Sequence, residues 1–502
     1  MNKIKKFANN LITPGGTFSQ RVVKSGFWVF FLRIIDQGFG LLRLIILARI
    51  LSPNDFGLMG IALLTMSILE TFSETGFQQA LIQKKEDIKS YLDNAWTFLI
   101  LRGFILFVIL YFIAPYAAIF FNAPEAKPII RVIGFSILFQ AFTNIGITYF
   151  KKELEFNKEF IYQLAGTLAD FIVAISAVLI LKNVWALVLG LLAGNITRCF
   201  VSYLIHPYRP RLNFALEKVK ELFGFGKWIL GSSIIIFLLI QGDDIFVGKL
   251  LGTTTLGFYQ LAYRISNMPA TEITQVISQV TFPAYSKLQD NIPKLREAYL
   301  KVLQFTAFLS FPLAGLIFIL APDFTKIFLG EKWIPMIQAM QVLCFFGITR
   351  AINATIGSIF QGIGKPNIIT LGAGFQLIIL VIIIYPLTNK WGISGTSLAV
   401  VIPNALVMLY LCKKLANALN YKLAHFIGSL LPFIIGSAIM CVVIFFFQVW
   451  SDRSIVSFLI SILIGIIAYS IAVYEIDKIF NYCLKSNLTQ LLKELKVKTK
   501  YE

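Results

Sequence analysis

The sequence predicts an all-α polytopic membrane protein of about 14 transmembrane helices, arranged as two six-helix lobes followed by two further helices. Three observations lead to this fold class. Of the 502 residues, 57% are hydrophobic and only 14% are charged, and the mean hydropathy is +0.76. Apolar stretches long enough to cross a bilayer follow one another almost without interruption. The basic residues gather between alternate pairs of these stretches.

Each apolar stretch meets the length that a spanning helix requires, roughly 20 mostly apolar residues. In chain order, the expected spans cover residues 25–48, 56–79, 95–121, 128–149, 160–181, 184–205, 226–248, 256–282, 299–320, 335–360, 367–387, 391–411, 426–449 and 454–474. The expected domains are a basic arm at 1–24, a first lobe at 25–205, an inter-lobe loop at 206–225, a second lobe at 226–415, two appended spans within 416–476 and a basic tail at 477–502.

The formal net charge of +19 indicates membrane topology rather than nucleic-acid binding. With the N-terminus in the cytoplasm, 30 of the 45 basic residues fall on the inner side, eight on the outer side and seven within or at the edges of spans. This distribution follows the positive-inside rule and predicts that both termini are cytoplasmic, with some attraction to anionic lipid. No nucleic-acid partner is expected, because the chain has no soluble basic domain and no binding motif.

An internal repeat supports the division into two lobes. Residues 26–62 align without a gap on residues 226–262 with eight identities, among them Trp28/Trp228 and Gly57/Gly257. The alignment holds one register through a span, a short outer turn and the start of the next span. Parallel halves are typical of transporters, which bind substrate between the halves near the middle of the membrane. The alternative is two packing units that only share ancestry.

Polar residues recur on single helical faces of the first lobe. Span one carries Arg33, Asp36, Gly40 and Arg43 at successive spacings of three or four residues. Span two carries Glu70 and Glu74 in the same spacing, and span five adds a further carboxylate; the carboxylate candidates of this lobe are Asp36, Glu70, Glu74 and Asp170. An ionisable group inside the membrane costs at least ~2.5–3.5 kcal/mol, so each needs a partner or water.

The second lobe repeats this pattern. Span eight carries Arg264, Asn267 and Glu272, and span ten carries Arg350 and Asn353. We therefore expect a hydrated cavity of mixed charge between the lobes, where arginines can hold phosphate or carboxylate through two bonds at once. The alternative for any single residue is a charge pair that only locks helices together.

No catalytic or metal-binding motif accompanies these residues, so the chain is expected not to be an enzyme. The connections reach only about twenty residues, too short for a catalytic domain. The two histidines, His206 and His425, stand at inner-side boundaries, and the five cysteines are scattered. We expect no metal site and no cofactor.

Three segments resemble a known family: Leu47–Leu58 (LARILSPNDFGL), Thr75–Lys85 (TGFQQALIQKK) and Asp243–Tyr259 (DDIFVGKLLG, then LGFY). They are similar to polysaccharide flippases in the polysaccharide transporter branch of the multidrug/oligosaccharidyl-lipid/polysaccharide superfamily. The likeness extends over about 20–475 and looks closest to O-antigen, colanic-acid and teichuronic-acid exporters.

This resemblance implies a bacterial plasma-membrane flippase that works by alternating access. Its cargo would be an oligosaccharide on undecaprenyl pyrophosphate, moved from the inner to the outer leaflet for surface polysaccharide synthesis. Arg33, Arg264 and Arg350 would hold the pyrophosphate. The carboxylates, Glu272 among them, would serve proton or sodium coupling or pair with arginines. A polymerase and glycosyltransferases of the same pathway are further expected partners.

Three alternatives stay open at this point. A cation-coupled multidrug exporter of the same superfamily would use Asp36, although the arginines on the polar faces would repel cationic drugs. A lipid II flippase shares the fourteen spans but fits the three segments less well. A subunit that scaffolds a polysaccharide assembly complex would need no transport activity.

Overall fold

The computed structural model describes residues 18–74, 77, 81, 88–153, 155–214 and 216–480, and within these ranges it contains helices and no strand. In chain order they are α2 (Phe18–Ile50), α3 (Pro53–Phe72), α5 (Lys89–Phe120), α6 (Ala126–Ala141), η1 (Ile145–Ile147), α7 (Thr148–Lys152), α8 (Phe156–Leu181), α9 (Trp185–Ile205), α10 (Leu216–Leu251), α11 (Thr253–Leu288), α12 (Ile292–Phe324), η2 (Thr325–Leu329), η3 (Glu331–Met336), α13 (Ile337–Gly362), α14 (Asn367–Ala418), α15 (Leu423–Gly428), α16 (Leu431–Trp450) and α17 (Ile455–Phe480). The predicted all-α fold is confirmed.

The chain divides into two compact units. The first comprises residues 1–241 and 248–257, and the second comprises 242–247 and 258–502, so α10 and α11 contribute to both. The predicted arm up to residue 17 and the predicted tail after Phe480 lie outside the described residues. The predicted inter-lobe loop is shorter than expected, because α10 already begins at Leu216.

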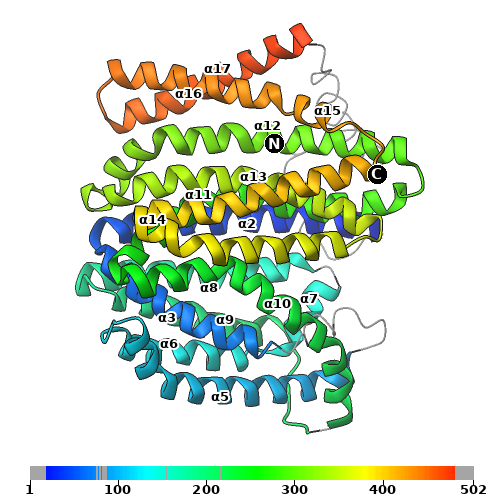
Figure 1. Ribbon diagram of the computed structural model, residues 1–502. Coiled ribbons are helices and arrows are strands. Elements are labelled where there is room, and N and C mark those ends of the chain that lie inside the picture. The colour runs from blue at the N-terminus through cyan, green and yellow to red at the C-terminus, as the bar shows by residue number, and fades with distance from the viewer. Residues whose placement is uncertain are drawn as a thin grey trace, which may run out of the picture. The chain divides into compact units, whose positions relative to one another are not determined.

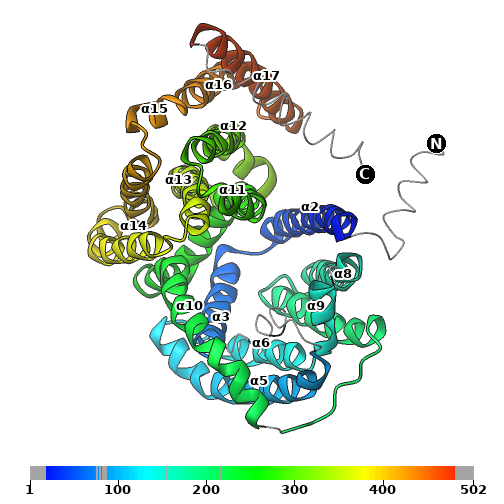
Figure 2. The same ribbon diagram turned by 90° about the vertical axis from the view of Figure 1, so that its right-hand side faces the viewer.

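In the first unit, α8 packs against α9, α5 against α6, and α2 against α8. Figure 1 shows α5, α6, α8 and α9 side by side, and Figure 2 views them nearly end-on. The α8–α9 packing is close because Gly190 and Gly194 bring α9 against Asp170 and the backbone at Gly166. This G-x-x-x-G pair therefore serves helix packing, as small residues commonly do between membrane helices.

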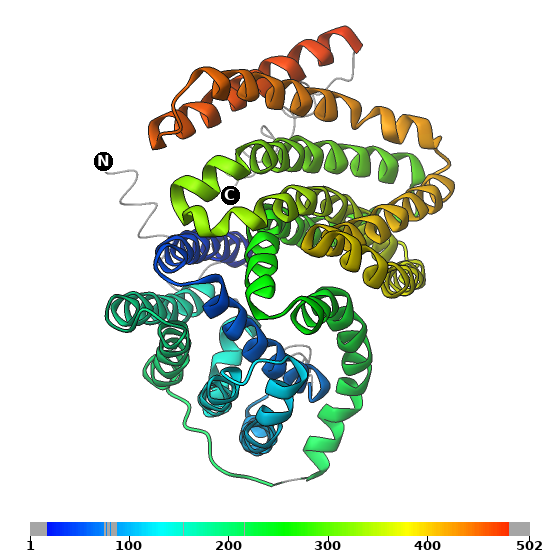
Figure 3. The same cartoon turned by 60° about the vertical axis from the view of Figure 1, so that its left-hand side comes forward.

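The second unit is built around α12, α13 and α14, which pack in that order. The helices α16 and α17 form a pair that contacts α12, and Figure 3 shows them in orange and red. One buried cluster joins α13 and α14 to α12 and includes Tyr299, Ile356, Phe360, Leu411 and Leu415. A second cluster, with Phe433 and Tyr469, attaches α16 and α17.

One predicted span differs from the observed helices. The span expected at 128–149 ends at Ala141, and the following segment Ile145–Lys152 bends away by 67°. Asn144 adopts an extended conformation there, and its side chain accepts a hydrogen bond from the Gly146 N–H at 2.9 Å, which starts the new helix. The two spans expected at 367–387 and 391–411 are confirmed as the two arms of α14, which meet at a kink at Gly392 with φ 56°.

The helices in the described part include nine that are long and apolar enough to cross a membrane, or ten if the bent pair is one span. The helix α14 counts once among these although it holds two predicted spans. The helices α2, α10 and α11 are not among them, and each carries polar residues that the sequence placed inside the membrane. The number fourteen is compatible with this result and stays a prediction.

The connector after α9 is held to the first unit by side chains. The Asp93 carboxylate accepts hydrogen bonds from the Tyr208 hydroxyl at 2.7 Å and from the Arg211 N–H at 2.8 Å. The Asn144 amide donates to the Tyr208 carbonyl at 2.7 Å. His206 stacks on Tyr149 with ring centroids 5.8 Å apart. Burial lowers the pKa of His206, and the nearby Lys158 lowers it further.

The first turns of α3 and α11 meet at two glycines that the repeat aligned. A capping box starts α3, in which the Ser52 hydroxyl accepts from the Asp55 N–H and the Asp55 carboxylate accepts from the Ser52 N–H. A Cβ on Gly57 would meet the Thr253 carbonyl oxygen, and one on Gly257 would meet the Pro53 carbonyl oxygen. Backbone contact therefore leaves no room for a side chain at either position.

We expect Gly57→Ala to destabilise the protein by about 1–3 kcal/mol, because overpacking against backbone cannot be relieved by a rotamer change. Thermal unfolding in detergent measures this. Gly38→Ala is the matched control, since a Cβ there meets nothing within 4 Å. Equal melting temperatures for the two variants would contradict the close approach.

His206 makes stability depend on pH. Its pKa is lowered in the folded state, so the unfolded state binds the proton more tightly and acid destabilises the fold. Lowering the pH from about 7.5 to about 5.5 should therefore lower the melting temperature of the wild type more than that of His206→Asn. Parallel pH profiles for the two proteins would contradict this role.

Candidate functional site

The polar faces of α2 and α8 in the first unit meet each other. The Arg43 guanidinium lies 2.9 Å from the Asp170 carboxylate, and both side chains are mostly buried. The Thr167 hydroxyl donates to the Asp36 carboxylate at 2.7 Å. Of the predicted residues on these two helices, Asp36 and Asp170 thus have partners across the α2–α8 contact, whereas Arg33 lies half-buried nearer the start of α2.

The end of α3 is held by an arginine of α5. The Arg102 guanidinium donates to the Ser73 carbonyl at 2.8 Å, to the Ser73 hydroxyl at 2.9 Å and to the Glu70 carbonyl at 3.0 Å. The Glu74 carboxylate instead accepts from the Ser233 hydroxyl at 2.6 Å. Arg102 therefore binds protein groups at the end of a helix.

In the second unit, the predicted residues of α11 and α13 lie close to Tyr263. The buried Asn267 donates through Nδ2 to the Tyr263 carbonyl at 3.1 Å, and Arg350 lies within electrostatic reach of the Tyr263 side chain. Asn353 donates to the Asn404 amide oxygen of α14 at 3.1 Å. Arg264 is exposed on α11, and the side chain of Glu272 lies outside the described residues.

Both asparagines keep an amide oxygen available. The Oδ1 atoms of Asn267 and Asn353 are buried and accept no hydrogen bond. A buried acceptor without a donor is costly, so these two positions favour a ligand with hydroxyl or N–H donors.

A pair of adjacent carboxylates in α10 has partners that the sequence did not reveal. The Tyr259 hydroxyl donates to the buried Asp243 carboxylate at 2.6 Å, and the Gln260 amide donates to the Asp244 carboxylate at 3.1 Å. These bonds tie α10 to α11 within the second unit. The sequence feature that could have indicated this pairing is two pairs of adjacent polar residues, Asp243-Asp244 and Tyr259-Gln260, sixteen positions apart.

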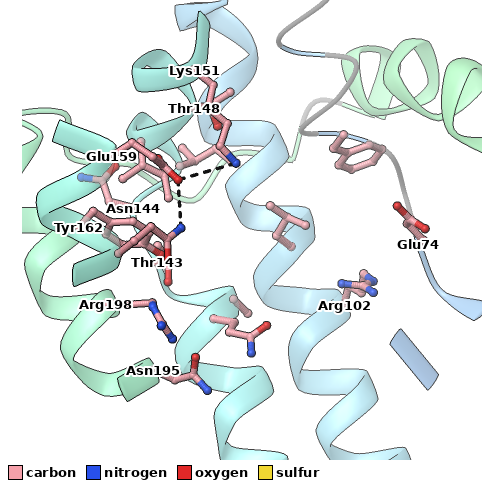
Figure 4. Close-up of a pocket in the computed structure, with 17 residues that line it drawn as sticks. Glu74, Arg102, Thr143, Asn144, Thr148, Lys151, Glu159, Tyr162, Asn195 and Arg198 are labelled. Atoms are coloured by element: carbon pink, nitrogen blue, oxygen red, sulfur yellow. Dashed lines mark hydrogen bonds and ion pairs between the residues drawn. The ribbon is translucent and has the colours of Figure 1, made fainter. Parts of the chain in front are cut away.

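The first unit also contains a cavity that was not predicted from the sequence. It has a volume of about 540 Å³ and lies between α5, α6, α7, α8 and α9. Figure 4 shows Arg102 and Glu74 on one side and Lys151, Glu159 and Arg198 on the other. Among its lining residues, only Glu74 was a predicted site residue. In the part of the chain that the structure describes, no cluster of three His, Cys, Asp or Glu side chains could hold a metal ion.

The Arg43–Asp170 pair generates a double-mutant prediction. Arg43→Leu leaves the Asp170 carboxylate largely buried without its guanidinium, and we expect a loss of about 1–3 kcal/mol, discounted for partial exposure. The double variant Arg43→Leu/Asp170→Leu should recover much of that loss. Melting temperatures in detergent measure the cycle, with Asp36→Asn as a control that keeps a polar partner for Thr167. Losses that simply add would contradict direct coupling.

Comparison with known proteins was made for sequence and structure. A family model described as "Polysaccharide biosynthesis protein" matches residues 46–338. The lipopolysaccharide biosynthesis protein WzxC of Escherichia coli (strain K12) is 25% identical over 82% of this chain and 85% of its own length. The teichuronic acid biosynthesis protein TuaB of Bacillus subtilis (strain 168) is 28% identical over 59% of this chain and 62% of its own.

Among solved structures, the lipid II flippase MurJ in its inward closed conformation matches with a TM-score of 0.73 and 18% identity, covering 91% of this chain and 99% of MurJ. At that identity the match establishes the fold alone. The family predicted from the three sequence segments is confirmed, and the chain belongs to the polysaccharide biosynthesis protein family.

Proposed function

We propose that this protein is a flippase that moves oligosaccharide repeat units, linked to a polyprenyl pyrophosphate, from the inner to the outer leaflet for surface polysaccharide synthesis. It is a transporter and not an enzyme. The observation that carries this proposal is the family match over 46–338, because the matched residues cover most of the first predicted lobe and more than half of the second within an all-helical membrane fold. The relative WzxC, which serves lipopolysaccharide biosynthesis, extends the likeness over most of the chain.

Cargo binding is assigned to the arginines and asparagines that the sequence placed on polar helix faces. Arg33, Arg264 and Arg350 hold the pyrophosphate, since guanidinium groups bind phosphate through two parallel bonds. Asn267 and Asn353 orient the sugar, because their unpaired buried amide oxygens can accept hydrogen bonds from sugar hydroxyls. The lipid tail stays in the bilayer while the headgroup crosses by alternating access.

Coupling to H⁺ or Na⁺ is assigned to the carboxylates. Asp36 and Asp170 are the strongest candidates of the first unit, because both stand at the α2–α8 contact with a neutral or cationic partner that can be exchanged. Glu70, Glu74 and Glu272 are further candidates. No resident cofactor is needed for this scheme.

The proposed location is the bacterial plasma membrane, crossed many times, with both termini in the cytoplasm. The basic residues support that orientation, since 30 of 45 fall on the side assigned as inner. A glycosyltransferase set that supplies the lipid-linked unit and a polymerase that consumes it are the proposed pathway partners.

In vesicles that hold the lipid-linked repeat unit, the protein should expose the sugar on the opposite leaflet. We expect Arg33→Ala or Arg264→Ala to slow this at least about tenfold at normal expression, because one charge-assisted bond to phosphate is worth ~1.5–3 kcal/mol. Accessibility of the sugar to an added lectin measures the rate. Lys413→Ala, which removes an exposed charge, is the control.

Wild-type rates in both arginine variants would overturn the site assignment but leave the family intact. A wild-type protein that exposes no sugar would overturn the flippase proposal itself.

A further inference from the structure

The cavity of the first unit lies at the ends of helices that the charge distribution assigns to the cytoplasmic side. Its lining comes from the end of α3, the first half of α5, the bend after α6, the start of α8 and the end of α9. At about 540 Å³ it falls within the range of small-molecule sites, ~300–1,000 Å³. All of its lining residues belong to the first unit, and Arg33, Arg264 and Arg350, to which pyrophosphate binding is assigned, are not among them.

Most charged groups of this cavity already have partners in the protein. The Glu159 carboxylate accepts from the Gln163 amide at 3.0 Å and lies 3.9 Å from the Lys151 ammonium. Glu74 accepts from Ser233, and Arg102 donates to the end of α3. The helices around the cavity therefore already supply hydrogen-bond or ion-pair partners for these groups.

Arg198 is different. Within the described residues it forms no ion pair with a carboxylate, and its Nε is buried without an acceptor. Its side chain is fixed in place, because it runs over the backbone at Gly166, where a Cβ would collide with it. A half-buried guanidinium held rigidly without an ion-pair partner favours binding of an anion.

Two further hydrogen-bond donors in the cavity also favour binding of an anion. The Nδ2 of Asn195, one turn before Arg198 on α9, is buried and donates to no acceptor, and Asn195 is only 6% exposed. The Thr148 hydroxyl is fully buried and also unpaired. Figure 4 shows Asn195 and Arg198 projecting from the same helix toward α5 across the cavity. Three unpaired donors thus line one space in which the paired carboxylates are already satisfied.

We propose that this cavity is a binding site for a ligand with a phosphate or pyrophosphate group, held by the Arg198 guanidinium and the Asn195 amide, with Thr148 as a third donor. A phosphate group matches these donors because it offers several acceptor oxygens and accepts two parallel bonds from one guanidinium. A water molecule could satisfy Asn195 or Thr148 but would leave the charge of Arg198 uncompensated. The same chemistry is carried by lipid headgroups and by soluble phosphates.

The test measures binding to the purified full chain by native mass spectrometry, so it needs no transport activity. The probes are undecaprenyl pyrophosphate, phosphatidic acid, inorganic pyrophosphate and, as the zwitterionic control lipid, phosphatidylcholine. We expect at least one phosphate probe to be retained in preference to phosphatidylcholine. Retention of only undecaprenyl pyrophosphate identifies the carrier, retention of phosphatidic acid identifies membrane lipid, and retention of inorganic pyrophosphate identifies a soluble ligand.

Arg198→Gln should weaken retention of the preferred probe at least about tenfold, and Arg198→Lys should restore part of it, because it returns the charge without the two-pronged geometry. Arg131→Gln is the matched control: it removes an arginine that packs over Tyr111, away from the cavity. If Arg198→Gln does not fold, Asn195→Leu, which keeps the charge and removes one donor, gives the same test.

Equal retention of every probe by wild type and Arg198→Gln would overturn the proposal, as would a wild-type protein that prefers no phosphate probe. Either outcome leaves the flippase proposal untouched, since that depends on sugar exposure in vesicles. Conversely, a protein that exposes no sugar in vesicles but still binds phosphate through Arg198 would contradict the flippase proposal and support the phosphate site.

Discussion

The need to satisfy every polar group inside hydrocarbon governs this structure. Backbone groups meet it by forming helices, which account for every regular element in the described ranges. Side chains meet it by pairing across helix contacts, as Arg43 does with Asp170 and Asn353 with Asn404. Each such bond fixes the rotation of two helices about their axes, so polar residues define which faces meet while apolar residues supply contact area.

Glycine makes many of these polar contacts reachable. Gly190 and Gly194 bring α9 close enough for Asp170 to lie against it, and Gly166 leaves the path along which Arg198 crosses α8. Without these positions, the helices would stand apart by a side chain's width, and the charged groups between them would lose their partners. The glycines therefore set the distance between the packed helices, and the charged residues form their contacts at that distance.

Hydropathy and spacing predicted the helical fold and the polar faces of α2, α3, α8 and α11, because both depend on the sequence near each residue. They did not predict the bend at Asn144, since the segment that follows it, residues 145–150, is still mostly apolar. They also did not find the partners Tyr259 for Asp243 or Ser233 for Glu74, because spacing defines a face but not the neighbour it meets.

Some polar side chains inside the helix bundles are fully hydrogen-bonded by the protein, and others keep a buried polar atom without a partner. Asp243 and Arg102 form hydrogen bonds with other protein groups and hold helices together, as expected for charged residues with a structural role only. The guanidinium of Arg198 and the amide oxygens of Asn267 and Asn353 retain buried atoms without protein partners, as do Arg43 Nε and Asp244 Oδ1. Such an atom is costly unless water or a ligand satisfies it. A carrier must bind its cargo and then release it, so its binding groups must be tolerable both paired and unpaired. Positions with an anchored side chain and a free polar atom meet that requirement, and fully saturated pairs do not.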